Sequence, residues 1–290
     1  MIDKITIIGM GLIGSSIARN IMEKKLAHSL VAADVNEDVC KKVVDLGIAD
    51  YVTDDLARSV EGADVVVLCV PVGAMGMVAQ LIGPNLKAGA IVSDVGSVKV
   101  SVIDAIKPFF CSGIEIVPAH PIAGTEFSGP ESGFLELFDG RWCILTPLPE
   151  TSIKSVEVIT KLWEACGSRV EIMDAHHHDL VLGITSHLPH LIAYTIVGTA
   201  NDLEDDIKSE VIKFSASGFR DFTRIASSDP VMWRDVFLNN KDAVLEVLGR
   251  LNEDLSAMQR AIRKGDGDYL YQKFNDTRAI RKAIIDQGQA

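Results

Sequence analysis

Three glycines near the N-terminus have the spacing of a phosphate-binding turn. Gly9, Gly11 and Gly14 follow an apolar strand pattern and precede a helical one. Gly9 permits the tight turn, Gly11 lets the backbone approach a pyrophosphate, and Gly14 lets helix and strand pack closely. The N–H groups that begin the helix then face the phosphate charge. The residues predicted to contact a dinucleotide here are Gly9, Gly11, Leu12, Ile13 and Gly14.

An acidic residue stands where the ribose of such a dinucleotide would lie. Asp34 comes twenty residues after Gly14, at the end of the apolar run Leu30–Ala33. A carboxylate there accepts hydrogen bonds from the ribose 2′-OH and repels a 2′-phosphate. No arginine is adjacent, so the sequence favours NAD over NADP. The alternative is that Asp34 caps a helix beginning near Glu37.

Two further segments at strand ends carry residues suited to proton transfer. Ser93–Lys99 follows one apolar run and Ala119–Glu126 follows the next. His120 has the type and position of a proton acceptor near neutral pH. Ser97 offers a hydroxyl to orient a substrate or the imidazole. The alternatives are a histidine held only structurally at a strand end, and a serine that caps a helix starting near Lys99.

The elements that must position these residues alternate between short apolar runs and helical patterns. This alternation is typical of a parallel sheet with crossover helices, and continuously apolar strands indicate that helices cover both faces. Ligands lie at the carboxyl ends of such strands, so Val70 and Pro71 are also predicted to contact the cofactor. The predicted strands are Ile5–Ile8, Leu30–Ala33, Val65–Val70, Ala90–Ser93, Glu115–Val117, Trp142–Leu145 and Arg169–Ile172, and one predicted helix is Lys154–Cys166, ended by Gly167.

Beyond Asp174 the pattern becomes helical throughout. We therefore predict an α/β chain with a Rossmann-type, mostly parallel sheet domain at residues 1–174 and an all-helical domain at 175–290. The predicted helices are Leu180–Asn201, Glu204–Ala216, Asp229–Asn239, Lys241–Lys264 and Tyr269–Asp286.

The composition restricts the class of partner. With 290 residues, 48% hydrophobic and 23% charged, the chain reads as an ordinary soluble protein. A net charge of -12 argues against nucleic-acid or anionic-membrane partners. An anionic substrate would therefore need a local cluster of arginine or histidine. Five cysteines without a CxxC pair favour neither a disulfide framework nor zinc, and no signal-peptide pattern is present, so we expect a cytoplasmic protein.

Four motifs in order resemble the prephenate dehydrogenase family. They are DVGSVK at 94–99, HPIAGTE at 120–126, Ser186–His190 and Gly218–Ala226, and Asp229–Asp235 continues the match. The resemblance implies NAD-dependent oxidative decarboxylation of prephenate to 4-hydroxyphenylpyruvate in tyrosine biosynthesis, or arogenate dehydrogenase activity. The rivals are a 3-hydroxyacid dehydrogenase or pyrroline-carboxylate reductase relative, and an NAD-binding sensor without turnover. No strand-rich regulatory domain or mutase is evident, so we expect a stand-alone dehydrogenase.

The chemistry of prephenate requires a proton acceptor and cations for two carboxylates. The resemblance assigns the acceptor to His120 and an orienting hydroxyl to Ser97. Arg224 is the predicted bidentate carboxylate clamp; the alternative is a surface ion pair with Asp221. The predicted substrate contacts are Arg224, His190, Thr125, Arg220 and Ser217.

Some assignments around the substrate stay open. His187 and His190 lie three apart on one helix face; we choose His190 as the ligand. Glu126 and Asp221 are weaker candidates for charges that gate access. Family members often carry glycines where this chain has Ser215–Gly218. The hydroxyl of Ser217 therefore leaves the choice between a pyruvyl and an alanyl side chain open.

The histidine run His176–His178 looks like a metal-ligand set. Consecutive helical residues point about 100° apart, so three cannot converge on one ion. We predict a solvated helix start and no metal.

The uniformly apolar segment Leu180–Asn201 predicts assembly. Because His187, Pro189 and His190 are costly in lipid, we expect a buried helix rather than a membrane span. In the resembling family the helical domains of two subunits interlock, so we predict a homodimer with Arg224 acting either within its own subunit or across the interface.

Overall fold

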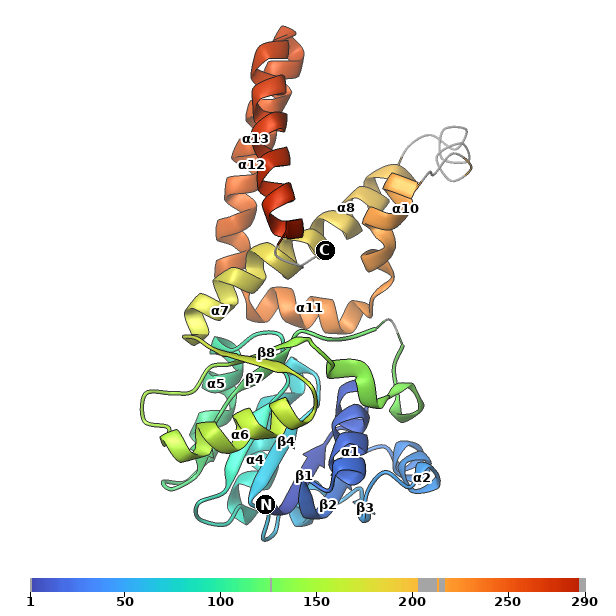
Figure 1. Ribbon diagram of the computed structural model, residues 1–290, viewed down its shortest axis with the longest axis vertical. Coiled ribbons are helices and arrows are strands. Elements are labelled where there is room, and N and C mark those ends of the chain that lie inside the picture. The colour runs from blue at the N-terminus through green and yellow to red at the C-terminus, as the bar shows by residue number, and fades with distance from the viewer. Residues whose placement is uncertain (1, 126, 203–212, 214–216, 287–290) are drawn as a thin grey trace. The chain divides into compact units, whose positions relative to one another are not determined.

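The computed structural model describes residues 2–125, 127–202, 213 and 217–286 (Figure 1). The chain divides into two compact units, Met1–Lys241 and Asp242–Ala290. The first unit contains both sheets and the candidate site.

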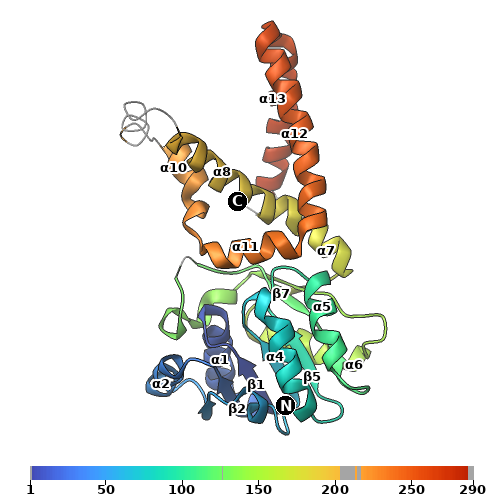
Figure 2. The same cartoon turned by 180° about the vertical axis from the view of Figure 1, so that it is seen from behind.

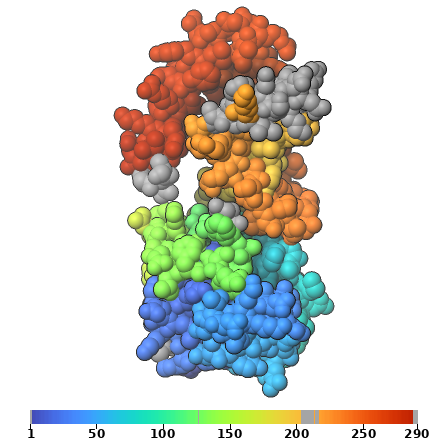
Figure 3. All heavy atoms as spheres, turned by 90° about the vertical axis from the view of Figure 1, so that its right-hand side faces the viewer, coloured from blue at the N-terminus to red at the C-terminus, as the bar shows by residue number. Residues whose placement is uncertain are grey.

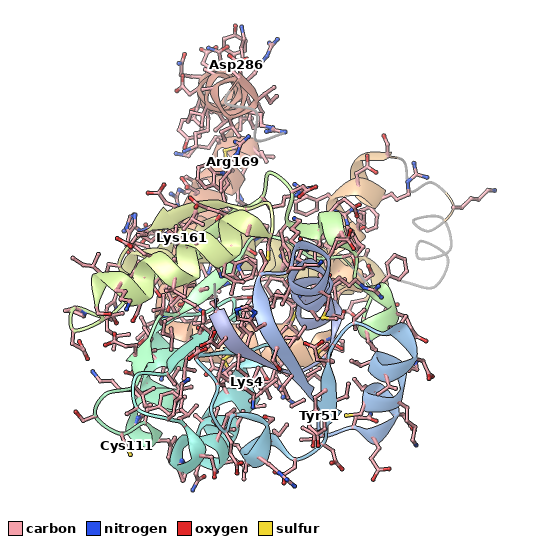
Figure 4. The ribbon with its side chains drawn as sticks, turned by 60° about the horizontal axis from the view of Figure 1, so that its bottom comes forward. Lys4, Tyr51, Cys111, Lys161, Arg169 and Asp286 are labelled. Carbon is pink, nitrogen blue, oxygen red and sulfur yellow. The ribbon has the colours of Figure 1, made fainter. Side chains whose placement is uncertain are left out.

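A six-stranded sheet with every pair parallel forms the centre of the first unit. Its order is β3-β2-β1-β4-β5-β6. The predicted Rossmann-type sheet is therefore confirmed, with its switch point between β1 and β4. In Figure 4, Tyr51 on β3 and Cys111 just before β6 mark its two edges. The strands are β1 (Ile2–Ile8), β2 (Ala27–Ala33), β3 (Tyr51–Thr53), β4 (Val65–Leu68), β5 (Ile91–Asp94) and β6 (Glu115–Ile116).

Helices cover both faces of this sheet, as the continuously apolar strands predict. Successive residues of one strand face opposite layers, so Ile7 packs in one core and Ile8 in the other. Figure 1 is seen from the side of α1 and α6, and Figure 2 from the side of α4 and α5. One layer contains α1 (Leu12–Lys24), α2 (Glu37–Leu46) and α6 (Ile153–Ala165); the other contains α3 (Leu56–Ser59), α4 (Met75–Ile82) and α5 (Val100–Ile106). Short 3-10 turns η1 (Val72–Ala74), η2 (Gly83–Asn85) and η3 (Lys107–Phe109) connect them.

The structure contains a second, three-stranded sheet, which the strand pattern of the sequence did not distinguish from the first. Its strands are β7 (Ala119–Pro121), β8 (Trp142–Leu145) and β9 (Arg169–Ile172), with β7 antiparallel to β8 and β8 parallel to β9. His120 therefore lies inside β7, opposite Ile144, rather than in a loop after the preceding strand. Three residues are too few for β7 or β3 to show a periodic pattern.

The connection between β7 and β8 packs against the first helix. Its turns are η4 (Pro130–Ser132) and η5 (Leu135–Phe138). The backbone N–H of Phe134 donates to Ser16 Oγ at 3.1 Å, and Asn20 Nδ2 donates to the Leu135 carbonyl at 2.9 Å. Figure 3 shows this green segment against the blue N-terminal elements.

Helices follow Asp174, which caps α7 by accepting from two backbone N–H groups. A π-helical turn precedes Pro189, where a proline without an N–H breaks the regular pattern. The elements are α7 (Ala175–Leu182), the π turn η6 (Gly183–His187), α8 (Leu188–Asn201), α10 (Ser217–Thr223), the 3-10 turn η7 (Arg224–Ser227) and α11 (Pro230–Asn239). The predicted helix Glu204–Ala216 falls, except for Lys213, outside the described residues.

One helical stretch in the described part of the chain, Ala175–Asn201, is long and apolar enough to cross a membrane. Length and composition are weak grounds for a span, because core and interface helices of soluble proteins share them. Only 22% of its most apolar window is buried within this single chain. The predicted burial of this segment is therefore not achieved within one subunit.

The second unit is a helical hairpin. It consists of α12 (Lys241–Lys264) and α13 (Gly267–Asp286), both close to prediction. Gly265, with φ +67°, permits the turn between them, and Lys273 Nζ lies 3.2 Å from Asp254 Oδ1 across the pair. The division after Lys241 differs from the predicted domain boundary at 174/175, which stays a prediction.

Candidate active site

The glycine turn combines tight packing with open space at one position. Gly9 has φ +95°, and a Cβ there would lie 2.6 Å from the Cys69 carbonyl oxygen. A Cβ on Gly14 would lie 2.1 Å from the Gly9 carbonyl oxygen. A Cβ on Gly11, the N-cap residue of α1, would meet nothing within 4 Å. The backbone at Gly11 is thus bare and accessible, which fits a pyrophosphate.

Asp34 lies beside this turn with its carboxylate held in place. Its Oδ2 accepts from the Met10 backbone N–H at 2.8 Å and its Oδ1 from the Asn36 N–H at 3.0 Å. Asn36 supplies the cap of α2 by accepting from Asp38 and Val39. The interpretation of Asp34 as the helix cap is therefore wrong.

The other predicted cofactor contacts surround the same turn. Leu12 and Ile13 are half-buried at the start of α1. Val70 Cγ1 would lie 2.9 Å from a Cβ on Gly9, and Pro71 is exposed at the start of η1. All of them lie at the carboxyl ends of β1 and β4, the two strands of the switch point.

His120 begins a chain of buried hydrogen bonds. Its Nδ1 lies 2.9 Å from Nε2 of His178 on α7, and the two rings meet edge to face. His178 Nδ1 lies 2.8 Å from Asp179 Oδ1. His120 is 8% exposed and His178 is fully buried. The proton acceptor predicted from the sequence is therefore coupled to two residues that the sequence analysis did not select.

The Asp179 carboxylate also caps the N-terminus of α5, the helix that follows Ser97. It accepts from the backbone N–H groups of Lys99 at 2.8 Å and Val100 at 3.0 Å. No side chain of its own segment caps α5. The interpretation of Ser97 as the helix cap is wrong, because α7 supplies the cap from a distant part of the sequence. Ser97 itself is half-buried between β5 and α5.

A fully buried ion pair lies behind the histidines. Lys99 Nζ contacts Asp94 Oδ2 and donates to the Ala119 carbonyl at 2.6 Å. Asp94 also accepts from the Gly96 N–H at 2.7 Å and the Ala119 N–H at 3.3 Å. The pair ties the end of β5 to β7 at the residue before His120.

Burial lowers the pKa of three histidines in this region. It holds the pKa of His120 well below 6.5, and the neighbouring charges of His178, Lys99 and His187 act in the same direction. Burial also lowers the pKa of His178, opposed by its hydrogen bond to Asp179. The pKa of His187 falls to about 4, mainly through burial. At neutral pH, His120 is therefore uncharged and able to accept a proton.

His187 and His190 have different surroundings. His187 is fully buried, and its Nδ1 accepts from Asn240 Nδ2 at 2.9 Å. His190 is half-buried, donates from Nδ1 to the Ser186 carbonyl at 2.8 Å, and stacks on Trp233 with ring centroids 3.6 Å apart. Burial lowers the pKa of His190, and the charge of Arg224 lowers it further. His190, Trp233 and Arg224 thus lie near one another.

The remaining predicted substrate contacts are exposed. Arg224, Arg220 and Ser217 lie on α10 and η7, and Thr125 lies after β7. In the described ranges, neither arginine forms an ion pair with Asp221. Both guanidinium groups are therefore available to an anion. Glu126, Ser215 and Ala216 lie outside the described residues.

Comparison with known proteins decides the family. Residues 17–172 match the family model "Prephenate dehydrogenase, nucleotide-binding domain", and residues 174–276 match "Prephenate dehydrogenase, dimerization domain". The chain belongs to the prephenate dehydrogenase family. The first match begins at residue 17, after the glycine turn.

Relatives and solved structures agree with this family. The chain is 44% identical to a cyclohexadienyl dehydrogenase of Zymomonas mobilis over 97% of this chain and 95% of that protein. It is 30% identical to a prephenate dehydrogenase of Bacillus subtilis, over 98% of this chain and 76% of that protein. The structure of an A. aeolicus prephenate dehydrogenase with hydroxyphenyl propionate and NAD+ superimposes with a TM-score of 0.91 at 33% identity, over 98% of this chain and 99% of that one.

The rival families share only the fold. Structures of a pyrroline carboxylate reductase and a 3-hydroxyisobutyrate dehydrogenase match with TM-scores of 0.50 and 0.52, at 14% and 12% identity. Such likeness reflects the common sheet and helix arrangement rather than the site.

The histidine run His176–His178 was predicted to lie at a solvated helix start, and this is only partly correct. His176 and His177 are exposed at the solvated start of α7. His178 is buried and bonded to His120, so the prediction is wrong for this residue. The sequence did carry a signal for the burial of His178. Leu182 lies four residues after His178, so both residues lie on one helix face, and Leu182 is also buried. Within the described ranges no cluster of three or more potential metal ligands occurs.

Lys99 is the cation that the sequence analysis missed, and its loss has a predictable cost. Lys99→Met would leave the buried Asp94 carboxylate without its cation. We expect the free energy of unfolding, measured in urea, to fall by about 3–5 kcal/mol. Lys87→Met is the matched control, because the Lys87–Asp64 pair is partly exposed and its loss costs at most about 1 kcal/mol. Equal losses in the two variants would contradict the role of burial.

Proposed function

We propose that this chain catalyses the NAD-dependent oxidative decarboxylation of prephenate to 4-hydroxyphenylpyruvate. The observation that carries the proposal is the buried, uncharged His120, hydrogen-bonded through His178 to Asp179. The family match and the relatives named above support it. Arogenate is the alternative substrate, because Ser217 adds a hydroxyl where family members often have glycine.

The residues at the switch point fit NAD. Gly11 and the start of α1 would hold the pyrophosphate, and the Asp34 carboxylate would accept from the adenosine ribose. Val70 and Pro71 border the same space. The bound cofactor supplies the hydride acceptor for this chemistry.

The protein's own groups act on the substrate in three ways. His120 accepts the proton of the ring hydroxyl, and the Ser97 hydroxyl helps to orient it. Arg224 binds a carboxylate in bidentate fashion, and His190 lies beside it. Further contacts come from Arg220, Thr125 and Ser217. Arg220 and Arg224 provide the local positive charge that a chain of net charge -12 needs to attract a dianion.

Replacement of the proton acceptor tests the mechanism. We expect His120→Ala to lower kcat by ~10²–10⁴, the usual contribution of a positioned base. A base acts only when unprotonated, so wild-type kcat should fall as the pH drops through the pKa of His120, and this acid limb should lie below pH 6.5. The exposed His177→Ala serves as control. A near-normal kcat in His120→Ala would remove this residue from the mechanism.

The carboxylate clamp predicts a different kinetic signature. Arg224→Ala should raise KM for prephenate at least about tenfold with a smaller change in kcat, because the clamp acts in ground and transition states alike. Arg250→Ala, which removes an exposed arginine of α12, should change neither. An unchanged KM in a folded Arg224→Ala protein would show that this side chain does not bind substrate.

Cofactor choice follows from Asp34. Steady-state rates with prephenate and arogenate, each with NAD and NADP, should show at least a ~10-fold preference for NAD in kcat/KM. Asp34→Ala should narrow this gap by removing the repulsion of the 2′-phosphate, whereas Asp38→Ala, in the first turn of α2, should not. Comparable rates with both cofactors in the wild type would overturn the assignment.

We also propose that the protein is a cytoplasmic homodimer, with its domains at 1–174 and 175–290. The match to a dimerization domain supports this. So do the apolar side chains exposed on α8, α12 and α13: Ile196, Val197, Leu245, Leu255, Ile262, Phe274 and Ile280. Exposed apolar surface of this kind is typical of subunit interfaces.

The dimer gives a measurable outcome. Light scattering should report twice the chain mass of 31.4 kDa, and the interface should exceed about 2,000 Å². If pockets are shared between subunits, mixing His120→Ala with Arg224→Ala chains should restore activity. A fully active monomer at nanomolar concentration would refute the dimer.

A further inference from the structure

The hydrogen bonds around His120 determine which of its nitrogens can accept a proton. The Asp179 carboxylate only accepts hydrogen bonds, so His178 Nδ1, at 2.8 Å, carries a hydrogen and donates it. A neutral imidazole has a single N–H, so His178 Nε2 must accept. His120 Nδ1, at 2.9 Å from that nitrogen, is therefore the donor. Its lone pair is left on Nε2.

We propose that His178 and Asp179 are positioning residues that hold His120 with its hydrogen on Nδ1 and stabilise the cation formed when Nε2 takes up a proton. The identity of the proton donor, the substrate hydroxyl, rests on the proposed function. In that step the O–H bond breaks, its electron pair stays on oxygen, and an Nε2–H bond forms. No second proton has to move.

Burial and the charge of Lys99 oppose the protonation of His120, so the cation formed in this step needs a nearby negative charge. Lys99 and Asp94 lie behind His120 as an ion pair, and His187 on η6 is neutral near pH 7. The thiol of Cys143 on β8 contacts the backbone of His120, and burial raises the pKa of this thiol well above its usual value. Among the described residues, the Asp179 carboxylate is then the only charge of the group without an opposite partner. A proton on His120 supplies a positive charge that balances the Asp179 carboxylate.

The fixed orientation of Asp179 makes this arrangement specific. The backbone N–H groups of Lys99 and Val100 bind its two oxygens, and Asn240 Nδ2 donates to its backbone carbonyl at 2.8 Å. The carboxylate therefore cannot turn away from His178 without losing the cap of α5. Capping of α5 requires only an oxygen acceptor at position 179. The proposed role requires a negative charge at position 179 and an imidazole at position 178.

The first test reads the tautomer directly and uses no cofactor or substrate. Protein labelled with ¹⁵N-histidine is examined by long-range ¹H–¹⁵N correlation at pH 7, and the His120 signal is identified by its loss in His120→Gln. We expect a protonated Nδ1 and an unprotonated Nε2. A hydrogen on Nε2 would overturn the proposal. Because prephenate is absent, this result decides the tautomer whether or not the proposed reaction is correct.

The second test separates positioning from packing. Gln at 178 can still offer an oxygen to His120 Nδ1, whereas Leu of similar size cannot. We expect His178→Leu to lower kcat about 10²-fold or more and to lose the Nδ1–H tautomer, with His178→Gln at least about tenfold faster and retaining it. His177→Gln, at the exposed neighbour, should match the wild type. Equal losses in the Gln and Leu variants, with an unchanged tautomer, would show a merely structural role.

The third test concerns the charge. Asp179→Asn keeps an oxygen for the α5 cap but removes the carboxylate that stabilises the imidazolium. The pKa of His120, followed by the same NMR signal, should therefore fall below its wild-type value, and the acid limb of kcat should move to lower pH with it. An unchanged pKa in this variant would contradict the proposal.

Discussion

The carboxylate of Asp179 is the point on which the candidate site depends. It caps the start of α5 by accepting hydrogen bonds from the backbone N–H groups of Lys99 and Val100, and it orients His178. Through its carbonyl it also binds Asn240 at the end of α11. A single residue of α7 thus joins the helical segment to the sheet in the first unit. Burying a charge is costly unless it is hydrogen-bonded, and here three N–H groups bind the Asp179 carboxylate.

Topology explains why these groups meet. The parallel sheet brings its strand ends to one edge, so the glycine turn after β1 and Asp34 after β2 lie together. β7 is not part of the main sheet but pairs with β8, and His120 lies inside it. The residue before His120, Ala119, is hydrogen-bonded to both members of the Lys99–Asp94 pair. A histidine in a paired strand is held more rigidly than one in a loop. This rigidity suits a group that must meet a reacting hydroxyl.

The sequence was informative where a local pattern carries the meaning. The glycine spacing, the apolar strands and the period of α12 all predicted elements that the structure contains, because each is encoded by neighbouring residues. It was uninformative where a contact crosses long stretches of sequence. Asp179 caps a helix 79 residues away in the chain, so Ser97 was a reasonable but wrong candidate. His178 was hidden in a run whose other two members are solvated. The three-residue strands β3 and β7 left no period to detect.

We propose that His120, presented by the buried network, receives the proton of the substrate hydroxyl. The most direct measurement is a crystal structure of this protein with NAD+ and hydroxyphenyl propionate, the pair bound in the A. aeolicus relative. We expect the ligand hydroxyl to lie within hydrogen-bond distance of His120 Nε2, about 2.6–3.2 Å, and the ligand carboxylate to lie at Arg224. A hydroxyl bound by another group, with His120 Nε2 facing away from the ligand, would contradict it.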